Sequence, residues 1–257
     1  METMPALNKT ARKPLDRSVD PAEVERFADM AGEWWDPSGK FAPLHRFNPV
    51  RLEFIRDRLA ARAKRDPLGD QPLKGLRVLD VGSGGGLIAE PLARLGARVT
   101  GIDAGEKNVA VASAHAKGQG LAIDYRFAST ADLVAARESF DAVLSLEVVE
   151  HVADRAAFVA DCARLVEPDG LLILATLNRT AKSFLFGIVA AEYVLRWLPR
   201  GTHDWNRFVR PSELAGDLRR AGMKLTELMG VGYNPISDRF SLTKDVDVNY
   251  LAVAERG

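Results

Sequence analysis

Short apolar runs alternate with segments of helical spacing along most of the chain. The apolar runs are RVLDVG (77–82), RVTGID (98–103), FDAVLSLEV (140–148) and GLLILATLN (170–178). Runs this short, with few polar positions, are typical of strands buried on both faces. Between them lie LIAEPLARLG, GEKNVAVASAHAKG and DRAAFVADCARLVEPDG, whose apolar residues recur at helical spacing. The alternation predicts an α/β protein with a doubly wound, mostly parallel sheet.

Both ends of the chain depart from this alternation. At the C-terminus, KLTELMGVGY and DVDVNYLAVAER are strand-like with no helix between them, which predicts a closing hairpin and an antiparallel last strand. Residues 20–65 predict helices laid over the sheet, with Asp20 as N-cap and Pro21 at the first helical position. Residues 179–210 form a long insertion before the next helix. We therefore expect a disordered segment at 1–19 and a single domain over 20–257.

Composition narrows the classes of partner and compartment. Lys plus Arg and Asp plus Glu number 35 each, so no overall field favours nucleic acid, and we expect no nucleic-acid partner. The single cysteine, Cys162, excludes an internal disulfide and a cysteine metal cage. The first residues, METMPALNKTARKPLDRSVD, lack the apolar core of a secretory signal. These features predict a cytoplasmic protein.

Glycines follow the first predicted strand, at the sheet edge where such folds bind ligands. A dinucleotide fingerprint starting at Gly82 and Gly84 would need glycine at position 87, which is Leu87. Asp103 ends the second strand, where a carboxylate binds the ribose hydroxyls of NAD or of S-adenosylmethionine (SAM). Asp80 separates the two cofactors, because it would repel a pyrophosphate but attract the cationic amino group of SAM.

Glu147, Glu150 and His151 follow the fourth predicted strand, at the same edge of the sheet. If this loop turned helically, their i, i+3, i+4 spacing would put them on one face, as ligands for a divalent cation. Solvated or helix-capping side chains would show the same spacing, so the pattern alone leaves both readings open.

The run D-x-G-x-G-x-G at Asp80, Gly82, Gly84 and Gly86 resembles the first motif of class I SAM-dependent methyltransferases. More specifically, the chain resembles the ubiquinone biosynthesis O-methyltransferase family, in blocks that spread from about residue 27 to 252. These blocks are FADMAGEWWDPSGKFAPLHRFNPVRLEFI, LDVGSGGG, VTGIDAGEKNV, SLEVVEHV, ATLNRT, AAEYVLRWLPRGTHDW, FVRPSEL, YNP and DVDVNYLA. One departure is Ser83, where relatives often carry cysteine.

The resemblance implies a fold, an activity and ligands. The fold is the Rossmann-like class I methyltransferase fold, with a mostly parallel sheet of seven strands and an antiparallel last strand. The activity is SAM-dependent methylation of a ring hydroxyl of a polyprenyl hydroxyphenol and of 3-demethylubiquinol. SAM contacts are implied at Arg51, Gly82, Asp103 and Leu146. Mg²⁺ is implied at Glu147, Glu150 and His151, because eukaryotic relatives are assigned the ion at this E-x-x-E-H motif.

The reaction itself favours one residue as general base. A phenol is a poor nucleophile at neutral pH, so a base or a metal should help to remove its proton. His151 carries the imidazole at the predicted catalytic edge, with Glu147 and Glu150 orienting it or sharing a divalent ion with the substrate. His45 and His203 either line the quinol pocket or have structural roles, and Trp34 and Trp35 either roof the aromatic ring or pack the N-terminal helices.

The insertion contains SFLFGIVAAEYVLRWL (183–198), which is too short and too charged for a transmembrane span. An apolar helix with cationic edges suits the membrane headgroup region, where a polyprenyl tail must be collected; the alternative is a lid helix packed on the sheet. We therefore expect a polyprenylated phenol or quinol substrate, peripheral contact with the inner face of the membrane, and association with a ubiquinone-biosynthesis enzyme complex.

Three other functions stay open on the sequence. One is a different class I SAM-dependent methyltransferase with a small-molecule substrate. Another is an NAD-dependent dehydrogenase, which Leu87 and Asp80 disfavour. The third is a noncatalytic SAM-binding or membrane-associated scaffold.

Overall fold

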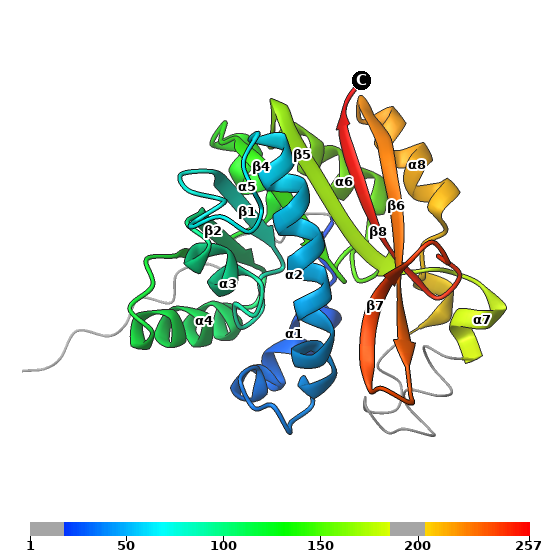
Figure 1. The fold of residues 1–257 in the computed structure, drawn as a ribbon, viewed down its shortest axis with the longest axis horizontal. Coiled ribbons are helices and arrows are strands. Elements are labelled where there is room, and N and C mark those ends of the chain that lie inside the picture. Colours follow the sequence, from blue (N-terminus) through cyan, green and yellow to red (C-terminus); the bar gives the residue numbers. More distant parts are fainter. Residues whose placement is uncertain (1–17, 186–203) are drawn as a thin grey trace, which may run out of the picture.

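The computed structural model describes residues 18–185 and 204–257, which are built around one eight-stranded sheet (Figure 1). The strand order is β3-β2-β1-β4-β5-β8-β6-β7. Strands β1 to β5 run parallel, and β8 is antiparallel to both of its neighbours, β5 and β6. The strands are β1 (Arg77–Val81), β2 (Arg98–Asp103), β3 (Asp124–Phe127), β4 (Phe140–Leu146), β5 (Val166–Leu177), β6 (Met223–Asn234), β7 (Arg239–Thr243) and β8 (Asn249–Arg256).

The predicted α/β sheet is confirmed, with three differences in its strands. All four apolar runs form strands, β1, β2, β4 and β5, but the half-exposed edge strand β3 lacks an apolar run and was not predicted. The expected number of seven strands was wrong, because β7 adds an eighth along the outer edge of β6. The two C-terminal runs do pair as β6 and β8, but they are connected through β7 rather than by a direct hairpin.

Each face of the sheet has its own apolar core, because successive strand residues point to opposite sides. Val78 joins a core with α2 and α3, whereas the next residue, Leu79, joins a core with α6 and α8. Leu172 and Ile173 divide in the same way between the two cores. The helices are α2 (Ala42–Arg62), α3 (Ala89–Arg94), α4 (Glu106–Gly118), α5 (Thr130–Ala135), α6 (Arg155–Arg164) and α8 (Pro211–Arg220). Figure 1 shows α2 lying across one face of the sheet.

The N-terminal segment folds into α1 (Pro21–Asp29) and the short 3-10 helix η1 (Ala31–Glu33), followed by α2. Asp20 is the N-cap of α1, and its Oδ1 accepts a hydrogen bond of 3.1 Å from the backbone N–H of Ala22. Pro21 occupies the start of the helix, as predicted, where its missing N–H costs no hydrogen bond. Of the segment expected to be disordered, residues 1–17 lie outside the described residues.

The insertion is described only at its two ends, by α7 (Ala181–Ser183) and the 3-10 helix η3 (Trp205–Arg207). Residues 186–203 lie outside the described part, and with them most of the apolar segment 183–198 and His203. Within 18–185 and 204–257, none of the helices has the length and apolar character needed to cross a membrane.

Candidate active site

A cavity of about 1040 Å³ opens at the carboxyl ends of β1, β2 and β4. One end is lined by the glycine loop after β1 and by acidic side chains. The other is lined by apolar side chains of α1, α2 and the β6–β7 hairpin. Pockets for a single drug-sized ligand span roughly 300 to 1,000 Å³, so this cavity has room for a cofactor and a second small molecule together.

The loop after β1 needs glycine at two positions for reasons of backbone and space. Gly82 has φ +71°, and a Cβ there would lie 2.4 Å from Cγ2 of Val148. Gly84 has φ +53°, and a Cβ there would lie 2.5 Å from Cζ2 of Trp34. L-residues with side chains rarely adopt such φ values, so both positions favour glycine even before a ligand is considered.

Asp103 ends β2 and holds this loop in place. Its carboxylate accepts hydrogen bonds from Gly84 N at 3.0 Å, from Gly105 N at 2.7 Å and from Asn108 Nδ2 at 3.1 Å. Burial raises the pKa of Asp103, and these three donors oppose the rise. Trp34 Nε1 donates to Asn108 Oδ1 at 3.0 Å, which joins the N-terminal segment to the same network.

Asp80, on β1, is a buried carboxyl group that forms no ion pair with the part of the chain that the structure describes. Its Oδ2 forms no hydrogen bond with the described residues, and its side chain lines the cavity. Burial, and secondarily the nearby charge of Asp103, raises the pKa of Asp80 to about 7. A buried unpaired carboxylate is costly in free energy, so the position fits a cationic ligand group such as the amino group of SAM.

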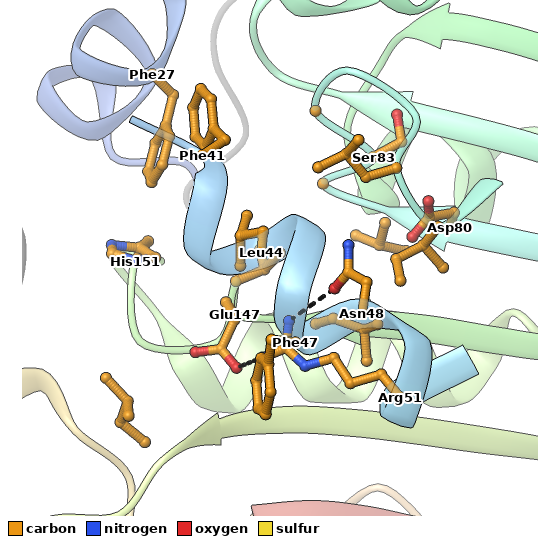
Figure 2. A pocket seen from close by; sticks show the side chains of 18 of the residues that line it. Phe27, Phe41, Leu44, Phe47, Asn48, Arg51, Asp80, Ser83, Glu147 and His151 are labelled. Carbon is orange, nitrogen blue, oxygen red and sulfur yellow. Dashed lines mark hydrogen bonds and ion pairs between the residues drawn. The ribbon is translucent and has the colours of Figure 1, made fainter. Parts of the chain in front are cut away.

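Arg51, on α2, is buried, and its side chain lines the same cavity as Asp80. It forms an ion pair with Glu147, and its Nη1 lies 3.4 Å from Asn48 Oδ1, as the dashed lines in Figure 2 show. Its guanidinium carbon lies 3.8 Å from the centre of the Phe47 ring. Burial lowers the pKa of Arg51, while Glu147 and Glu150 oppose that effect. These contacts hold the guanidinium of Arg51 at the cavity wall, paired with the carboxylate of Glu147. The methionyl carboxylate of SAM would offer it the same kind of interaction.

The E-x-x-E-H residues lie on one loop, and each of them also contacts a residue of another element. Glu147, with φ +57°, pairs with Arg51, and the buried Glu150 accepts a hydrogen bond of 2.9 Å from Thr176 Oγ1. Burial and the charge of Glu147 raise the pKa of Glu150 well above its usual value. His151 Nδ1 lies 2.8 Å from Oε2 of Glu23.

The predicted Mg²⁺ site does not fit this arrangement. Among residues 18–185 and 204–257, no three His, Cys, Asp or Glu side chains form a group that could hold a metal ion. The loop after β4 does not form a helix over 147–151: a bend at Glu147 is followed by a single turn, in which the His151 N–H donates to the Val148 carbonyl at 2.8 Å. Of the three, Glu147 and His151 line the cavity.

The predicted SAM contacts all reach the same cavity. Arg51 comes from α2, Asp80 from β1, Asp103 from β2 and Leu146 from the end of β4, and the loop after β1 brings the remaining two, Gly82 and Gly84.

Among the described residues, the other aromatic and imidazole candidates, His45, Trp34 and Trp35, contact one another's segments and the glycine loop. His45 Nε2 lies 2.9 Å from the backbone carbonyl of Trp34. Trp35 Nε1 donates to the carbonyl of Gly85 at 2.9 Å, and its ring stacks on His115 at 3.6 Å. Trp34 lines the cavity and stacks on Phe41 at 3.7 Å. The two tryptophans thus cover the glycine loop.

Sequence reasoning missed the residues that come from distant elements. Asn108 lies in the quoted block VTGIDAGEKNV, so its position five residues after Asp103 was a usable signal. Glu23 gave none, because its helix precedes the glycine loop by more than fifty residues and only the fold brings it to His151. The apolar wall was missed for the same reason: Phe240 of β7 packs on Phe47 of α2, with ring centres 5.2 Å apart.

Comparison with known proteins gives similarity at three levels. A methyltransferase domain family matches residues 79–174. The ubiquinone biosynthesis O-methyltransferase of Parvibaculum lavamentivorans is 54% identical over 96% of this chain and 97% of its own length. The enzyme of the same name from Sinorhizobium fredii is 54% identical over 97% of this chain and 99% of its own.

Solved structures share the fold at low sequence identity. The magnesium protoporphyrin IX methyltransferase of Synechocystis, with bound SAH, has a TM-score of 0.59 at 21% identity, covering 92% of this chain and 95% of its own. The plantazolicin methyltransferase BpumL, in complex with a triazolic desmethylPZN analog and SAH, has a TM-score of 0.62 at 14% identity, covering 92% of this chain and 98% of its own. At these identities the likeness shows the class I methyltransferase fold.

Proposed function

The chain belongs to the ubiquinone biosynthesis O-methyltransferase family, and from that premise we propose how its cavity carries out SAM-dependent O-methylation. The acceptor is a ring hydroxyl of a polyprenylated phenol or of 3-demethylubiquinol. One observation carries the proposal: a single cavity is lined at one end by the glycine loop and acidic side chains and at the other by apolar side chains, and the imidazole of His151 lies in its wall.

The cofactor end of the cavity supplies binding groups for each part of SAM. Bound SAM supplies an electrophilic methyl group on a sulfonium. Asp80 would attract the amino group, and Arg51 the methionyl carboxylate. Asp103 would accept from the ribose hydroxyls, and Leu146 would provide an apolar wall for the adenine. Because glycine has no side chain, positions 82 and 84 let the cofactor approach the loop backbone closely.

The acceptor end supplies position and a base. Phe27, Phe47 and Phe240 form an apolar enclosure suited to a substituted aromatic ring and the start of a prenyl tail. Holding the ring hydroxyl in line with the methyl group supplies much of the rate enhancement. His151 would take the proton of the hydroxyl as its oxygen attacks, which is general base catalysis.

The metal is a separate hypothesis. Glu147, Glu150 and His151 would have to leave Arg51, Thr176 and Glu23 before they could share a divalent cation. The proposed reaction uses no such ion, and methylation in the presence of a chelator tests whether one is needed.

The experiment is methylation of a short-tailed 3-demethylubiquinol analogue with SAM, detected by mass spectrometry. The expected product gains one methyl group and forms equally well in EDTA. His151→Ala should lower turnover by about 10² to 10⁴-fold while SAM binding, measured by calorimetry, survives. Product lost in EDTA would restore the metal hypothesis, and unchanged turnover of His151→Ala would exclude this residue as the base.

A peripheral membrane location also belongs to this proposal. The described start of the 183–198 segment carries two exposed apolar side chains, Phe184 and Leu185, at 49% and 52% exposure. Such residues beside cationic ones suit the headgroup region of a cytoplasmic membrane face, where the substrate's tail resides. Other enzymes of the same biosynthesis, gathered at that surface, are the proposed protein partners.

A further inference from the structure

Glu23 contacts the candidate base, His151, but it lies on α1, which is not one of the elements that form the cofactor end of the cavity. Its Oε2 is 2.8 Å from His151 Nδ1. The two side chains are 20% and 15% exposed, and both line the cavity. An imidazole nitrogen and a carboxylate oxygen at this distance, largely withdrawn from water, are close enough for an ion pair when the ring is protonated.

The surroundings keep Glu23 ionised. The contact with His151 lowers the pKa of Glu23 most, and burial opposes the shift. Arg26 Nη2 lies 2.8 Å from the carboxylate, and Arg207 Nη1 lies 3.9 Å from it. Arg207 is in turn bound to Asp20, the N-cap of α1, at 2.6 Å. The carboxylate is therefore fixed by cations from its own helix and from η3.

The ring of His151 is fixed from a second direction. Phe27, one turn after Glu23 on α1, meets it edge to face with ring centres 5.3 Å apart, and both rings appear in Figure 2. The two acids on the loop of His151, Glu147 and Glu150, are engaged with Arg51 and Thr176. Glu23 is thus the carboxylate that the geometry assigns to the imidazole.

We propose that Glu23 is the positioning residue of the base: it accepts the Nδ1–H of His151 and leaves Nε2 unprotonated toward the acceptor hydroxyl. This rests on the proposed function. In the reaction, the hydroxyl proton passes to Nε2 while the hydroxyl oxygen forms a bond to the methyl carbon. The carbon–sulfur bond breaks with its electron pair going to sulfur, which neutralises the sulfonium. Glu23 stabilises the imidazolium until it releases the proton to water.

The same contact ties catalysis to docking of α1. Because Glu23 and Phe27 both hold the ring from this helix, the base is oriented only when α1 is packed against the loop after β4. The loss of either side chain should therefore act on turnover more than on cofactor affinity.

Turnover of Glu23→Ala, with Glu25→Ala as the matched control, tests the proposal. Glu25 lies two residues away on the same helix and is exposed. Glu23→Ala should lower kcat about 10-fold or more with KM for SAM unchanged, whereas Glu25→Ala should behave as the parent. In the double variant Glu23→Ala/His151→Ala, the loss should equal that of His151→Ala alone, because Glu23 acts through the ring. Losses that multiply, or a Glu23→Ala enzyme within twofold of the parent, would overturn the proposal.

Nitrogen NMR of the His151 ring separates this inference from the proposed function. The parent should show the Nδ1–H tautomer and Glu23→Ala a mixture, whether or not the acceptor is methylated; an Nε2–H tautomer in the parent overturns the assignment. If Glu23→Ala fails to fold, Glu23→Gln, which keeps the volume and one acceptor oxygen, takes its place, with an intermediate kcat expected. A parent without methylation activity but with the expected tautomer would refute the proposed function alone.

Discussion

Binding of SAM should expel a proton from Asp80. In the free protein, burial and Asp103 hold the pKa of Asp80 at about 7. The ammonium group of SAM beside this carboxylate favours the ionised form and lowers its pKa. At pH 6.5 about three-quarters of the Asp80 carboxyls are protonated before binding, so up to roughly three-quarters of a proton leaves per SAM bound.

The same equilibrium sets the pH dependence of affinity. Protonation of Asp80 weakens apparent binding by the factor 1 + 10^(pKa − pH), which is about 11 at pH 6 and about 2 at pH 7. Affinity should therefore rise about fivefold between these values. This window lies below the ordinary pKa of an α-amino group, about 7.7 to 8.0, so the amino group of SAM stays mostly protonated across it.

Calorimetric titration in two buffers of different ionisation enthalpy measures both quantities. The observed enthalpy should differ between the buffers by the number of protons released multiplied by the enthalpy difference. Asp80→Asn is the control, because it removes the titrating group and keeps the shape; it should bind SAM more weakly, with little proton release. Equal enthalpies in the two buffers at pH 6.5, together with a pH-independent Kd, would refute the reasoning.

The stability of the free protein provides an independent check of the sign. Asp80 has a folded-state pKa of about 7 against an ordinary value of 3.8, so the folded protein binds more protons than the unfolded chain between these values. The free energy of unfolding should therefore fall as pH rises from about 4 through about 7, and Asp80→Asn should lose that part of the pH dependence.

Two further substitutions test the loop and the insertion. Gly84→Ala puts a Cβ where φ is +53° and Trp34 is 2.5 Å away, so it should weaken SAM binding at least about tenfold and lower Tm. Gly118→Ala is the control, because the space around Gly118 is open, and it should leave both values near those of the parent. Equal behaviour of the two variants would contradict the argument. The double variant Phe184→Ser/Leu185→Ser should float less with anionic phospholipid vesicles than the parent. The control Leu68→Ser changes an exposed leucine on the α2–β1 connection and should float as the parent does. Undiminished flotation of the double variant would show that these two side chains do not contribute to membrane contact.

The fold was predictable wherever burial leaves a local pattern. Strands β1, β2, β4 and β5 are covered on both faces, so their sequences are continuous apolar runs. Strand β3 is an edge strand of sequence DYRF with no buried residue, and β7 pairs through one edge only, so neither leaves such a run. The sequence also predicted the end of α6 too late, because β5 begins at Val166 and includes Pro168 beside a register shift, where the missing N–H is tolerated.

The two ends of the cavity differ in how far apart their residues lie in sequence, and this explains which half of the site could be predicted. The cofactor end is built mainly from residues between Asp80 and Leu146, each at the carboxyl end of a strand, so sheet topology alone brings them together. The acceptor end combines α1 and α2 with the β6–β7 hairpin, from opposite ends of the chain, as the contact between Phe47 and Phe240 illustrates. No spacing rule connects such residues. Because the acceptor end depends on packing between separate elements, its shape can change by substitution there without disturbing the strand ends that hold the cofactor.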